Sequence, residues 1–359
     1  MVGRPIPPDL LPWALAGLAG QSGDGAVPTA VAGAAANHEP ALTVIAGDAS
    51  NRRYFRLQAG EQTWVVAEAP PATEKNPEFL AVRQVLADAG VRVPALLAAD
   101  LERGYLLLED LGDRLLLPAL TDQTVDGYYQ QCFSVLHCLA RAGRAGQALP
   151  TYNEALLREE LSRFPEWFAG ELLGYESDVT GTAVIEALAD VLVTNALAQP
   201  RVLVHRDFHS RNLMIQPDGE LAVIDFQDAV LGPVTYDLVS LLRDCYVRWP
   251  RDRVREWALA YRDSLLEQDL LEPVGDADFL RWFDWLGLQR HIKVLGTFAR
   301  LYLRDGKEAY LDDLPMVIAY VEEVLDVYAP QAPAFAQFSD WFARELKPLI
   351  AQQDWSTAP

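Results

Sequence analysis

Residues 204–214 read Val-His-Arg-Asp-Phe-His-Ser-Arg-Asn-Leu-Met, and they place two His, two Arg, one Asp, one Ser and one Asn in eleven positions. Side chains of these types bind metals, transfer protons and hold phosphates. A loop without a chemical task is more commonly built from Gly, Pro, Ser and Lys. Apolar residues flank the segment at 202–204 and 213–215, which predicts two short buried strands around it. The segment is therefore a candidate catalytic loop.

A predicted hairpin follows this loop. Asp218-Gly219 lies between two runs of alternating apolar residues, which is the strongest short hairpin signal because a two-residue turn needs positive φ. A turn at these two residues would place Asn212 opposite Asp225, with Cβ atoms about 4.5 to 5.5 Å apart. An amide oxygen and a carboxylate placed in this way suit Mg²⁺, which usually takes one or two protein ligands plus phosphate oxygens.

Asp207 lies five residues before Asn212, in the loop that leads into the hairpin. From there it can reach the same cleft and accept a proton from a hydroxyl nucleophile. The order Asp-x-x-x-x-Asn, followed by Asp225-Phe226 at a strand end, matches the phosphoryl-transfer template of kinases. The alternative is a polar loop in which Asp and Asn only cap turns. The motif, the hairpin and the preceding elements together favour the kinase interpretation.

The elements before this loop predict a small sheet. Residues 1–40 are rich in Ala, Gly and Pro and predict an N-terminal extension with one short helix. Next comes a predicted helix over 76–90, with Asn76 as its cap and Pro77 in its first turn. Five strands surround that helix in the chain, and they are predicted at 41–47, 52–57, 63–69, 95–99 and 104–110.

The chain after residue 111 is predicted to be mostly helical, apart from short apolar runs at 202–226. The coarse expectation is an α+β fold with a small antiparallel β lobe at 41–110 and a large, mainly helical lobe at 111–359. Seven helices are predicted from apolar periodicity, at 121–143, 152–170, 180–198, 236–247, 251–269, 277–304 and 314–328.

Composition restricts the partners and the compartment. The 359 residues include 30 Lys and Arg against 51 Asp and Glu, a net charge of −21 that repels nucleic acid and anionic membranes. Three sparse cysteines favour a reducing, cytoplasmic compartment. The apolar stretch 10–20 is short and follows Asp9, so we expect no signal peptide, and no run reaches the length that crosses a bilayer. The sequence leaves the oligomeric state open.

Five segments resemble a known superfamily. Loop 204–214 and the stretch that begins Ile-Asp-Phe-Gln-Asp-Ala are similar to the aminoglycoside phosphotransferases and choline kinases, which are relatives of the protein kinases. The chain more closely resembles the amino-sugar kinases that phosphorylate the anomeric hydroxyl of N-acetylmuramate and N-acetylglucosamine in bacterial cell-wall (peptidoglycan) recycling. The segments that carry the resemblance are 47–57, 106–114, 204–214, 223–246 and 288–307.

The resemblance implies a protein-kinase-like two-lobe fold and a set of residue roles. Asp207 would be the catalytic base, with His209 and Asp237 bracing its loop. Asn212 and Asp225 would bind Mg²⁺. Asp237 also reads as an ordinary acidic residue at a helix start.

The resemblance also implies an ATP site in the β lobe. Backbone groups of Glu109 and Leu111 would bind the adenine edge. A turn with a nearby arginine would cover the phosphates, formed by Gly47, Asp48, Ala49, Ser50, Asn51 and either Arg52 or Arg53.

One feature departs from the kinase pattern. Protein kinases carry a Lys on the third strand that holds the α- and β-phosphates, whereas strand 63–69 contains Glu68 and no cation. Arg52 or Arg53 could replace it, or Lys75 could fold back. A nucleotide-binding pseudokinase is a further alternative, and a kinase for an aminoglycoside, choline or an amino alcohol is the alternative enzyme.

The acceptor site is expected on the predicted helix 277–304. Arg290, His291, Lys293 and Arg300 lie along it, and one of them would suit the carboxylate of N-acetylmuramate. The alternative is a solvated helix face with local ion pairs. Asp207, Arg290 and His291 are candidate substrate ligands, as are Arg211 and Asp228 beside the catalytic groups.

Overall fold

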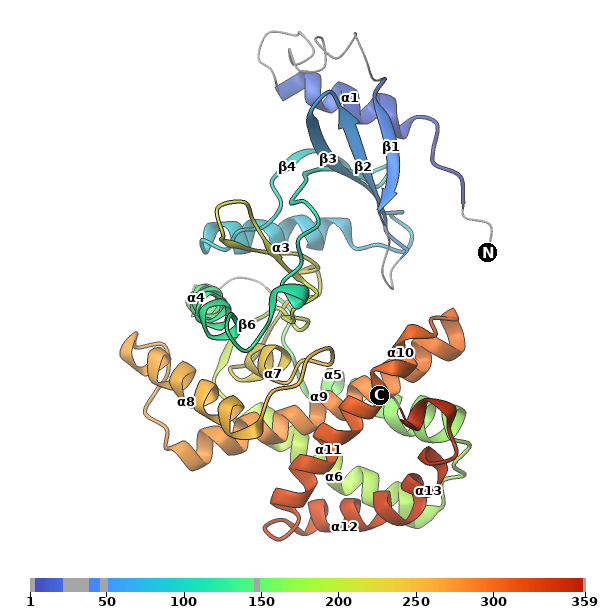
Figure 1. Ribbon diagram of the computed structural model, residues 1–359, viewed down its shortest axis with the longest axis vertical. Coiled ribbons are helices and arrows are strands. Elements are labelled where there is room, and N and C mark those ends of the chain that lie inside the picture. The colour runs from blue at the N-terminus through green and yellow to red at the C-terminus, as the bar shows by residue number, and fades with distance from the viewer. Residues whose placement is uncertain (1–3, 22–38, 46–50, 145–148, 358–359) are drawn as a thin grey trace. The chain divides into compact units, whose positions relative to one another are not determined.

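The computed structural model describes residues 4–21, 39–45, 51–144 and 149–357. The chain divides into two compact units (Figure 1). Unit 1 consists of residues 1–114 together with 213–227, and unit 2 consists of 115–212 together with 228–359. The catalytic-loop residues up to 212 therefore belong to unit 2, whereas the hairpin that follows them belongs to unit 1.

Unit 1 contains a five-stranded antiparallel sheet with the order β1-β2-β3-β5-β4. Helix α3 (Asn76–Asp88) lies between β3 and β4 in the chain, as predicted. The cap prediction was wrong, because Lys75 holds the N-cap position and Asn76 instead donates its amide to the Ala69 carbonyl at 2.7 Å. The strands are β1 (Ala41–Ile45), β2 (Arg53–Ala59), β3 (Gln62–Glu68), β4 (Leu96–Asp100) and β5 (Tyr105–Glu109).

Helix α1 (Leu10–Gln21) covers this sheet (Figure 1). Leu10, Ala14 and Leu18 recur every four residues, so they lie on one helix face, and all three are buried against strand residues such as Phe55 and Leu107. Burying a large apolar side chain contributes about 1.5 to 3 kcal/mol. The apolar stretch near the N-terminus therefore forms part of the core of unit 1.

The hairpin of β7 (Leu213–Ile215) and β8 (Leu221–Val223) has a different register from the predicted one. Leu213 pairs with Val223, and the turn contains three residues, since Gln216 donates to the Glu220 carbonyl at 2.8 Å. Pro217 favours the first corner of a type I turn, and Gly219, with φ +88°, takes the left-handed position after it. The turn chemistry thus shifts the ladder by one residue.

Unit 2 is mainly helical, and its helices account for the seven predicted ones, with 152–170 divided into α5 and a π-helical segment (Phe164–Leu172). One small sheet pairs β6 (Arg201–Val204) with β9 (Val230–Pro233). The helices are α4 (Val125–Arg144), α5 (Glu154–Arg163), α6 (Val179–Ala198), α7 (Tyr236–Leu242), α8 (Arg251–Glu267), α9 (Asp276–Asp305), α10 (Ala309–Asp312), α11 (Leu314–Tyr328), α12 (Pro333–Trp341) and α13 (Lys347–Ile350). Short turns of helix lie at Leu117–Ala119, Phe342–Leu346 and Asp354–Thr357, and these, like α10, α12 and α13, were not predicted.

Helix α9 runs through the middle of unit 2 and is buried along most of its length. Gly296 permits its close contact with the end of α5, because a Cβ at that position would lie 2.3 Å from the carbonyl carbon of Arg163. Any larger residue would force the two helices apart. This contact fixes the position of α9 along its own axis relative to α5, and therefore which polar residues of α9 lie opposite α5.

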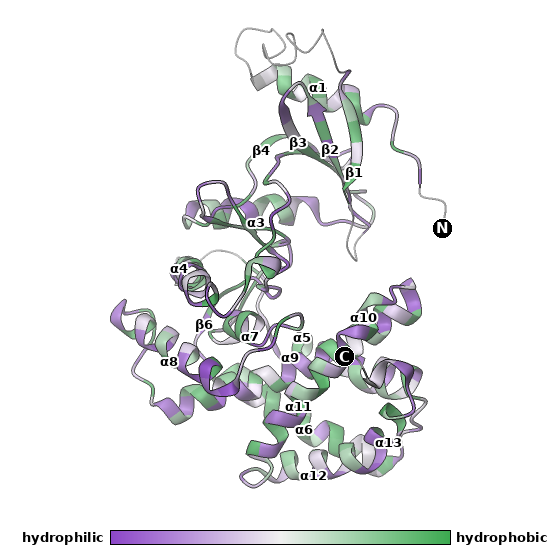
Figure 2. Cartoon of the chain, in the orientation of Figure 1, coloured by the Kyte–Doolittle hydropathy of each residue, from purple (hydrophilic) through white to green (hydrophobic). Residues whose placement is uncertain are grey.

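Helix α6 corrects the expectation about membrane spans. Among the described residues it is the one helix with the length and apolar composition of a span, and a core helix passes the same test. Leu188, Leu192 and Val193 are buried, and Asn195 donates to the Trp282 carbonyl. Figure 2 shows both hydrophobic and hydrophilic residues on the helices of unit 2.

Candidate active site

The catalytic loop begins directly after β6 and is held by Asp237 in the first turn of α7. The buried Asp237 carboxylate accepts hydrogen bonds from the backbone N–H groups of His205 at 2.6 Å and Arg206 at 3.0 Å. Arg206 has φ +78°, a left-handed conformation that costs a non-glycine residue about 1 to 3 kcal/mol. Asp237 stabilises this conformation, and this is the bracing contact that we expected of it. Asp237 also lies at a helix start, so both interpretations of this residue hold.

Hydrogen bonds within the loop set the positions of its polar residues. The Asp207 carbonyl accepts from the backbone N–H of His209 and from the Asn212 side-chain amide, both at 3.0 Å. Ser210 donates its N–H and hydroxyl to Asp244. Because Asn212 donates through Nδ2, the other end of its amide is an oxygen, the ligand type that Mg²⁺ prefers.

His209 contributes to the loop by packing and not by a change of protonation state. Its half-buried ring meets the ring of Tyr246 edge-on at 5.3 Å. Burial lowers the pKa of His209, so its imidazole is neutral near pH 7. Such a ring can support the loop through packing, which is the role expected of His209, and it is a poor proton donor.

The Asp207 carboxyl is half-buried and lies in a field of positive charge. Burial raises the pKa of Asp207, but the positive charges around it, chiefly those of Lys293, Arg290 and Arg206, outweigh that effect and hold the pKa below its ordinary value. The side chain is therefore a carboxylate at any physiological pH. A carboxylate of such low basicity binds a hydroxyl group as a hydrogen-bond acceptor and takes its proton only late in a reaction.

Arg290 and Lys293 of α9 are buried, so they do not form the solvated face considered as an alternative. Arg290 is 3% exposed, and its guanidinium contacts the Cys245 thiol at 3.4 Å. It makes no ion pair with a carboxylate in the part of the chain that the structure describes. Lys293 donates to the Tyr236 hydroxyl at 3.1 Å. A buried guanidinium with a thiol as its partner is suited to an incoming anion.

The structure contradicts the predicted ligand role of His291. The side chain is 0% exposed, its Nε2 lies 3.1 Å from the Arg243 carbonyl, and its ring stacks on Tyr320 at 4.7 Å. Burial holds the pKa of His291 well below its ordinary value. A neutral, enclosed imidazole cannot offer a charge to a substrate, so His291 serves the core. Arg300 is half-buried.

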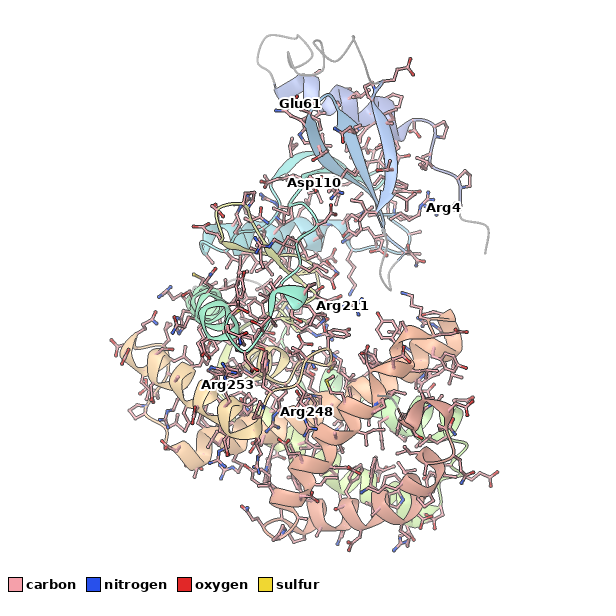
Figure 3. All side chains as sticks on the ribbon, in the orientation of Figure 1. Arg4, Glu61, Asp110, Arg211, Arg248 and Arg253 are labelled. Carbon is pink, nitrogen blue, oxygen red and sulfur yellow. The ribbon has the colours of Figure 1, made fainter. Side chains whose placement is uncertain are left out.

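Arg211 and Asp228 are the exposed members of the predicted set in unit 2. The Arg211 guanidinium lies over the Tyr246 ring at 4.5 Å. Arg211 is labelled in Figure 3. Asp228 has an exposed side chain, and its carbonyl accepts from Arg206 at 3.4 Å. Both therefore stay connected to the catalytic loop, Asp228 by a bond to Arg206 and Arg211 as one of the loop's own residues.

In unit 1, the direction of the Asp225 side chain is set by the backbone and not by the hairpin ladder. Strand β8 ends at Val223, and Asp225 has φ +62°, which is uncommon outside glycine and typical of functional positions. Its carboxylate accepts from Gln227 at 2.7 Å. The next residue, Phe226, is buried and stacks on Phe79 of α3 with ring centres 5.0 Å apart.

The two candidate arginines have different surroundings in unit 1. Arg52 is buried, lies over the Phe79 ring at 4.7 Å and comes within 3.6 Å of the Glu74 carboxylate. Arg53 pairs instead with Glu68 of β3 and donates to the Pro5 carbonyl at 3.0 Å. Arg52 is thus the one that shares Phe79 with the Asp225-Phe226 segment.

The phosphate-covering turn is described only at its end. Gly47, Asp48, Ala49 and Ser50 lie outside the described residues. The Asn51 N–H donates to Glu74 at 3.2 Å, so Glu74 contacts both Asn51 and Arg52. Lys75, the third candidate cation, is exposed.

The predicted adenine-binding strand end is also in unit 1. The Glu109 N–H donates to the Ala95 carbonyl at 2.9 Å, and the Leu111 carbonyl accepts from Gln216 at 3.3 Å. The Glu109 side chain pairs with Arg92. A nucleotide would therefore use the other two backbone groups, the Glu109 carbonyl and the Leu111 N–H.

Sequence reasoning missed Glu160 on α5. Its carboxylate is 0% exposed and contacts Arg206 of the catalytic loop, Lys293 of α9 and the Tyr152 hydroxyl. Nothing in the local sequence signals this, because Glu159 and Glu160 are adjacent in an ordinary charged helix segment. Only packing decides which of the two faces the core.

Comparison with known proteins gives one family and a group of close relatives. The model of the phosphotransferase enzyme family matches residues 41–283. A protein of Pseudomonas putida named N-acetylmuramate/N-acetylglucosamine kinase is 43% identical over 79% of this chain and 83% of its own length. The protein of the same name from Pseudomonas aeruginosa is 44% identical over 78% and 82%.

Solved structures show the same fold at low identity. Choline kinase LicA from Streptococcus pneumoniae aligns with a TM-score of 0.55 and 14% identity over 78% of this chain and 94% of its own. A structure of LicA in complex with AMP aligns with a TM-score of 0.51 and 15% identity over 81% and 96%. The small antiparallel sheet and the mainly helical remainder are those of the protein-kinase-like fold, as expected from the sequence.

Proposed function

Because this chain belongs to the phosphotransferase enzyme family and, within it, to the N-acetylmuramate/N-acetylglucosamine kinases, we propose that it transfers the γ-phosphoryl group of ATP to the anomeric hydroxyl of these two sugars. The reaction would be Mg²⁺-dependent and would serve peptidoglycan recycling in the cytoplasm. The observation that carries the proposal is the catalytic loop itself, which Asp237 braces through two backbone N–H groups and which places Asp207 near the buried cations Arg290 and Lys293.

Asp207 would orient the sugar hydroxyl and accept its proton. The low basicity of its carboxylate fits a loose transition state, in which the phosphorus–oxygen bond to ATP is largely broken before the hydroxyl loses its proton. Holding that hydroxyl in line with the phosphoryl group supplies most of the catalysis in such reactions. His209 would support the loop without touching the substrate.

Asn212 and Asp225 would hold Mg²⁺, which would offset the negative charge of the ATP phosphates. Their oxygen donors fit this ion. The support comes from their order in the kinase template and from the left-handed backbone of Asp225, since the observed hairpin register removes the predicted ladder argument. Backbone groups of Gly47–Asn51, Glu109 and Leu111 would hold the nucleotide.

The acceptor is tested by measuring ADP release with N-acetylmuramate, N-acetylglucosamine, choline and kanamycin. We expect turnover with the two sugars and a product whose phosphorus signal couples to the anomeric carbon. Activity with a cationic alcohol and with neither sugar would favour the alternative kinase. Nucleotide binding without turnover of any acceptor would favour a pseudokinase.

Arg290 is the proposed ligand of the N-acetylmuramate carboxylate, with Arg211 and Asp228 at the sugar ring. A charge-assisted hydrogen bond is worth about 1.5 to 3 kcal/mol, so Arg290→Ala should reduce the kcat/KM ratio of N-acetylmuramate to N-acetylglucosamine roughly tenfold or more. The measurement is kcat/KM for both sugars. Arg300→Ala, two to three turns further along the same helix, is the matched control and should leave the ratio unchanged. Equal losses on both sugars in Arg290→Ala would show that Arg290 serves the fold or the shared ring.

Arg52 is the proposed replacement for the missing third-strand Lys. Arg52→Ala should raise the KM for ATP roughly tenfold to a hundredfold and change the KM for sugar little, because a phosphate contact of about 1.5 to 3 kcal/mol is lost. The neighbouring Arg53→Ala is the matched control, since the Arg53 guanidinium is paired with Glu68. A normal KM for ATP in Arg52→Ala, with a raised value in Arg53→Ala or Lys75→Ala, would reassign the phosphate ligand.

A further inference from the structure

A buried carboxylate links the catalytic loop to the acceptor helix in unit 2. Glu160 of α5 pairs with Arg206, which directly precedes Asp207, and with Lys293 of α9 at 3.3 Å. The Tyr152 hydroxyl donates to the same carboxylate. One side chain therefore joins three segments that lie far apart in the sequence.

Further hydrogen bonds and a ring contact extend this network around Glu160. Lys293 also donates to the Tyr236 hydroxyl on α7 at 3.1 Å, and the Tyr152 and Tyr236 rings meet edge-on at 5.2 Å. Gln289, next to Arg290 in the chain, donates to the Tyr152 hydroxyl at 3.3 Å. The network thus reaches Gln289, directly before Arg290 on α9, Lys293, three residues after it, and Arg206, directly before Asp207 on the loop.

The charges of the network are not balanced within it. Arg206, Lys293 and Arg290 carry three positive charges near Asp207 and Glu160, which carry two negative ones. Buried ion networks are weak sources of stability, because apolar side chains of similar volume often serve a fold as well or better. The fold alone therefore gives little reason to bury Glu160 at this place.

The network holds Arg206 in an unusual backbone conformation. Arg206 is left-handed, with φ +78°. Asp237 binds its backbone N–H, and Glu160 binds its guanidinium. Asp237 thus holds the backbone of Arg206, whereas Glu160 and the Asp228 carbonyl hold its side chain. Together they fix the orientation in which the chain enters Asp207.

We infer that Glu160 is a positioning residue, which aligns Asp207 on the catalytic loop with Arg290 on α9 so that one acceptor sugar meets both. Lys293 completes this alignment. It binds the same Glu160 carboxylate from α9, so the position of α9 is tied to that of the catalytic loop. The inference rests on the proposed function in that it assigns the acceptor to Asp207 and Arg290. It adds the residue that holds them in register.

The test compares Glu160→Gln with Asp284→Asn. Asp284 is a matched control, because it is also buried and it also holds a buried arginine, Arg243, and a tyrosine hydroxyl, that of Tyr328 at 2.8 Å. Glu160→Gln should lower kcat for sugar at least tenfold and raise the share of ATP hydrolysed without sugar phosphorylation. Its dissociation constant for ATP, measured by calorimetry without sugar, should stay within twofold. Asp284→Asn should lower the melting temperature and leave kcat and the coupling ratio of the folded enzyme unchanged.

The double variant Glu160→Gln/Lys293→Met keeps the test decisive if Glu160→Gln folds poorly. It removes one charge of each sign, so the melting temperature should recover, whereas kcat and coupling should stay low. Recovery of kcat together with stability would overturn the inference, as would parental kcat and coupling in folded Glu160→Gln or the same losses in Asp284→Asn. If the parent enzyme phosphorylates neither sugar, the proposed function fails separately, and the same ratios are measured on the acceptor that the panel identifies.

Discussion

Asp207→Asn should lower kcat by about 10² to 10⁴-fold, the usual contribution of a general base, and leave the affinity for ATP near that of the parent. The substitution is nearly isosteric. The contacts that Asp207 makes to His209 and Asn212 use its backbone carbonyl, so the loop should keep its shape. The amide cannot accept the proton of the sugar hydroxyl, and it removes the negative charge that faces Lys293 and Arg290.

The measurements are kcat and KM for sugar and the dissociation constant for ATP in the absence of sugar. Asp278→Asn provides a control, because Asp278 is an exposed carboxylate that pairs with Arg281 on α9. It should behave as the parent does. A kcat of Asp207→Asn within a factor of a few of the parent value would contradict the assignment of Asp207 as the base.

Removing the Asp225 carboxylate should abolish Mg²⁺-dependent turnover. Asp225→Ala is the direct variant, and Asp225→Asn is the better controlled one, because Asn tolerates the left-handed φ of +62° and alanine does not. Asn212→Ala should keep measurable activity at a higher Mg²⁺ concentration, since it removes one neutral ligand and leaves the charged one. Mg²⁺ titrations of initial rate at saturating ATP distinguish these effects.

Gln227→Ala is the control for Asp225, because it removes a hydrogen bond to that carboxylate and no proposed ligand. Its titration curve should shift little. Parental Mg²⁺ curves in both the Asp225 and the Asn212 variants would falsify the assignment of these residues to the metal. A loss in Asp225→Ala alone, with normal turnover in Asp225→Asn, would point to backbone distortion instead.

Much of the fold was predictable because its signals are local. Apolar alternation and turn residues indicated all five strands of the β1–β5 sheet, and helical periodicity indicated α9 and the other long helices. The candidate catalytic loop was found in the same way, since its polar residues are concentrated between two apolar strands. The family resemblance rests on motifs of this local kind as well.

The hairpin shows the limit of local signals within a single turn. Asp218-Gly219 predicted a two-residue turn, but Pro217 before it favours a three-residue turn that ends at Gly219 with φ +88°. One residue of difference changes every pair in the ladder. The preference of Pro217 for the first corner of a type I turn outweighs the Asp-Gly signal.

Only the tertiary structure decided which charged residues serve the site. By sequence, Arg52 and Arg53 are equivalent neighbours, and Arg290, His291 and Lys293 are equivalent cations on one helix. Packing gives them different partners. Arg53 pairs with Glu68, and His291 stacks on Tyr320. Lys293 pairs with Glu160, which lies 133 positions earlier in the chain. The sequence determined the groups available for chemistry. Burial and distant partners determined which of them keep a charge and where it points, since both depend on contacts that no local pattern records.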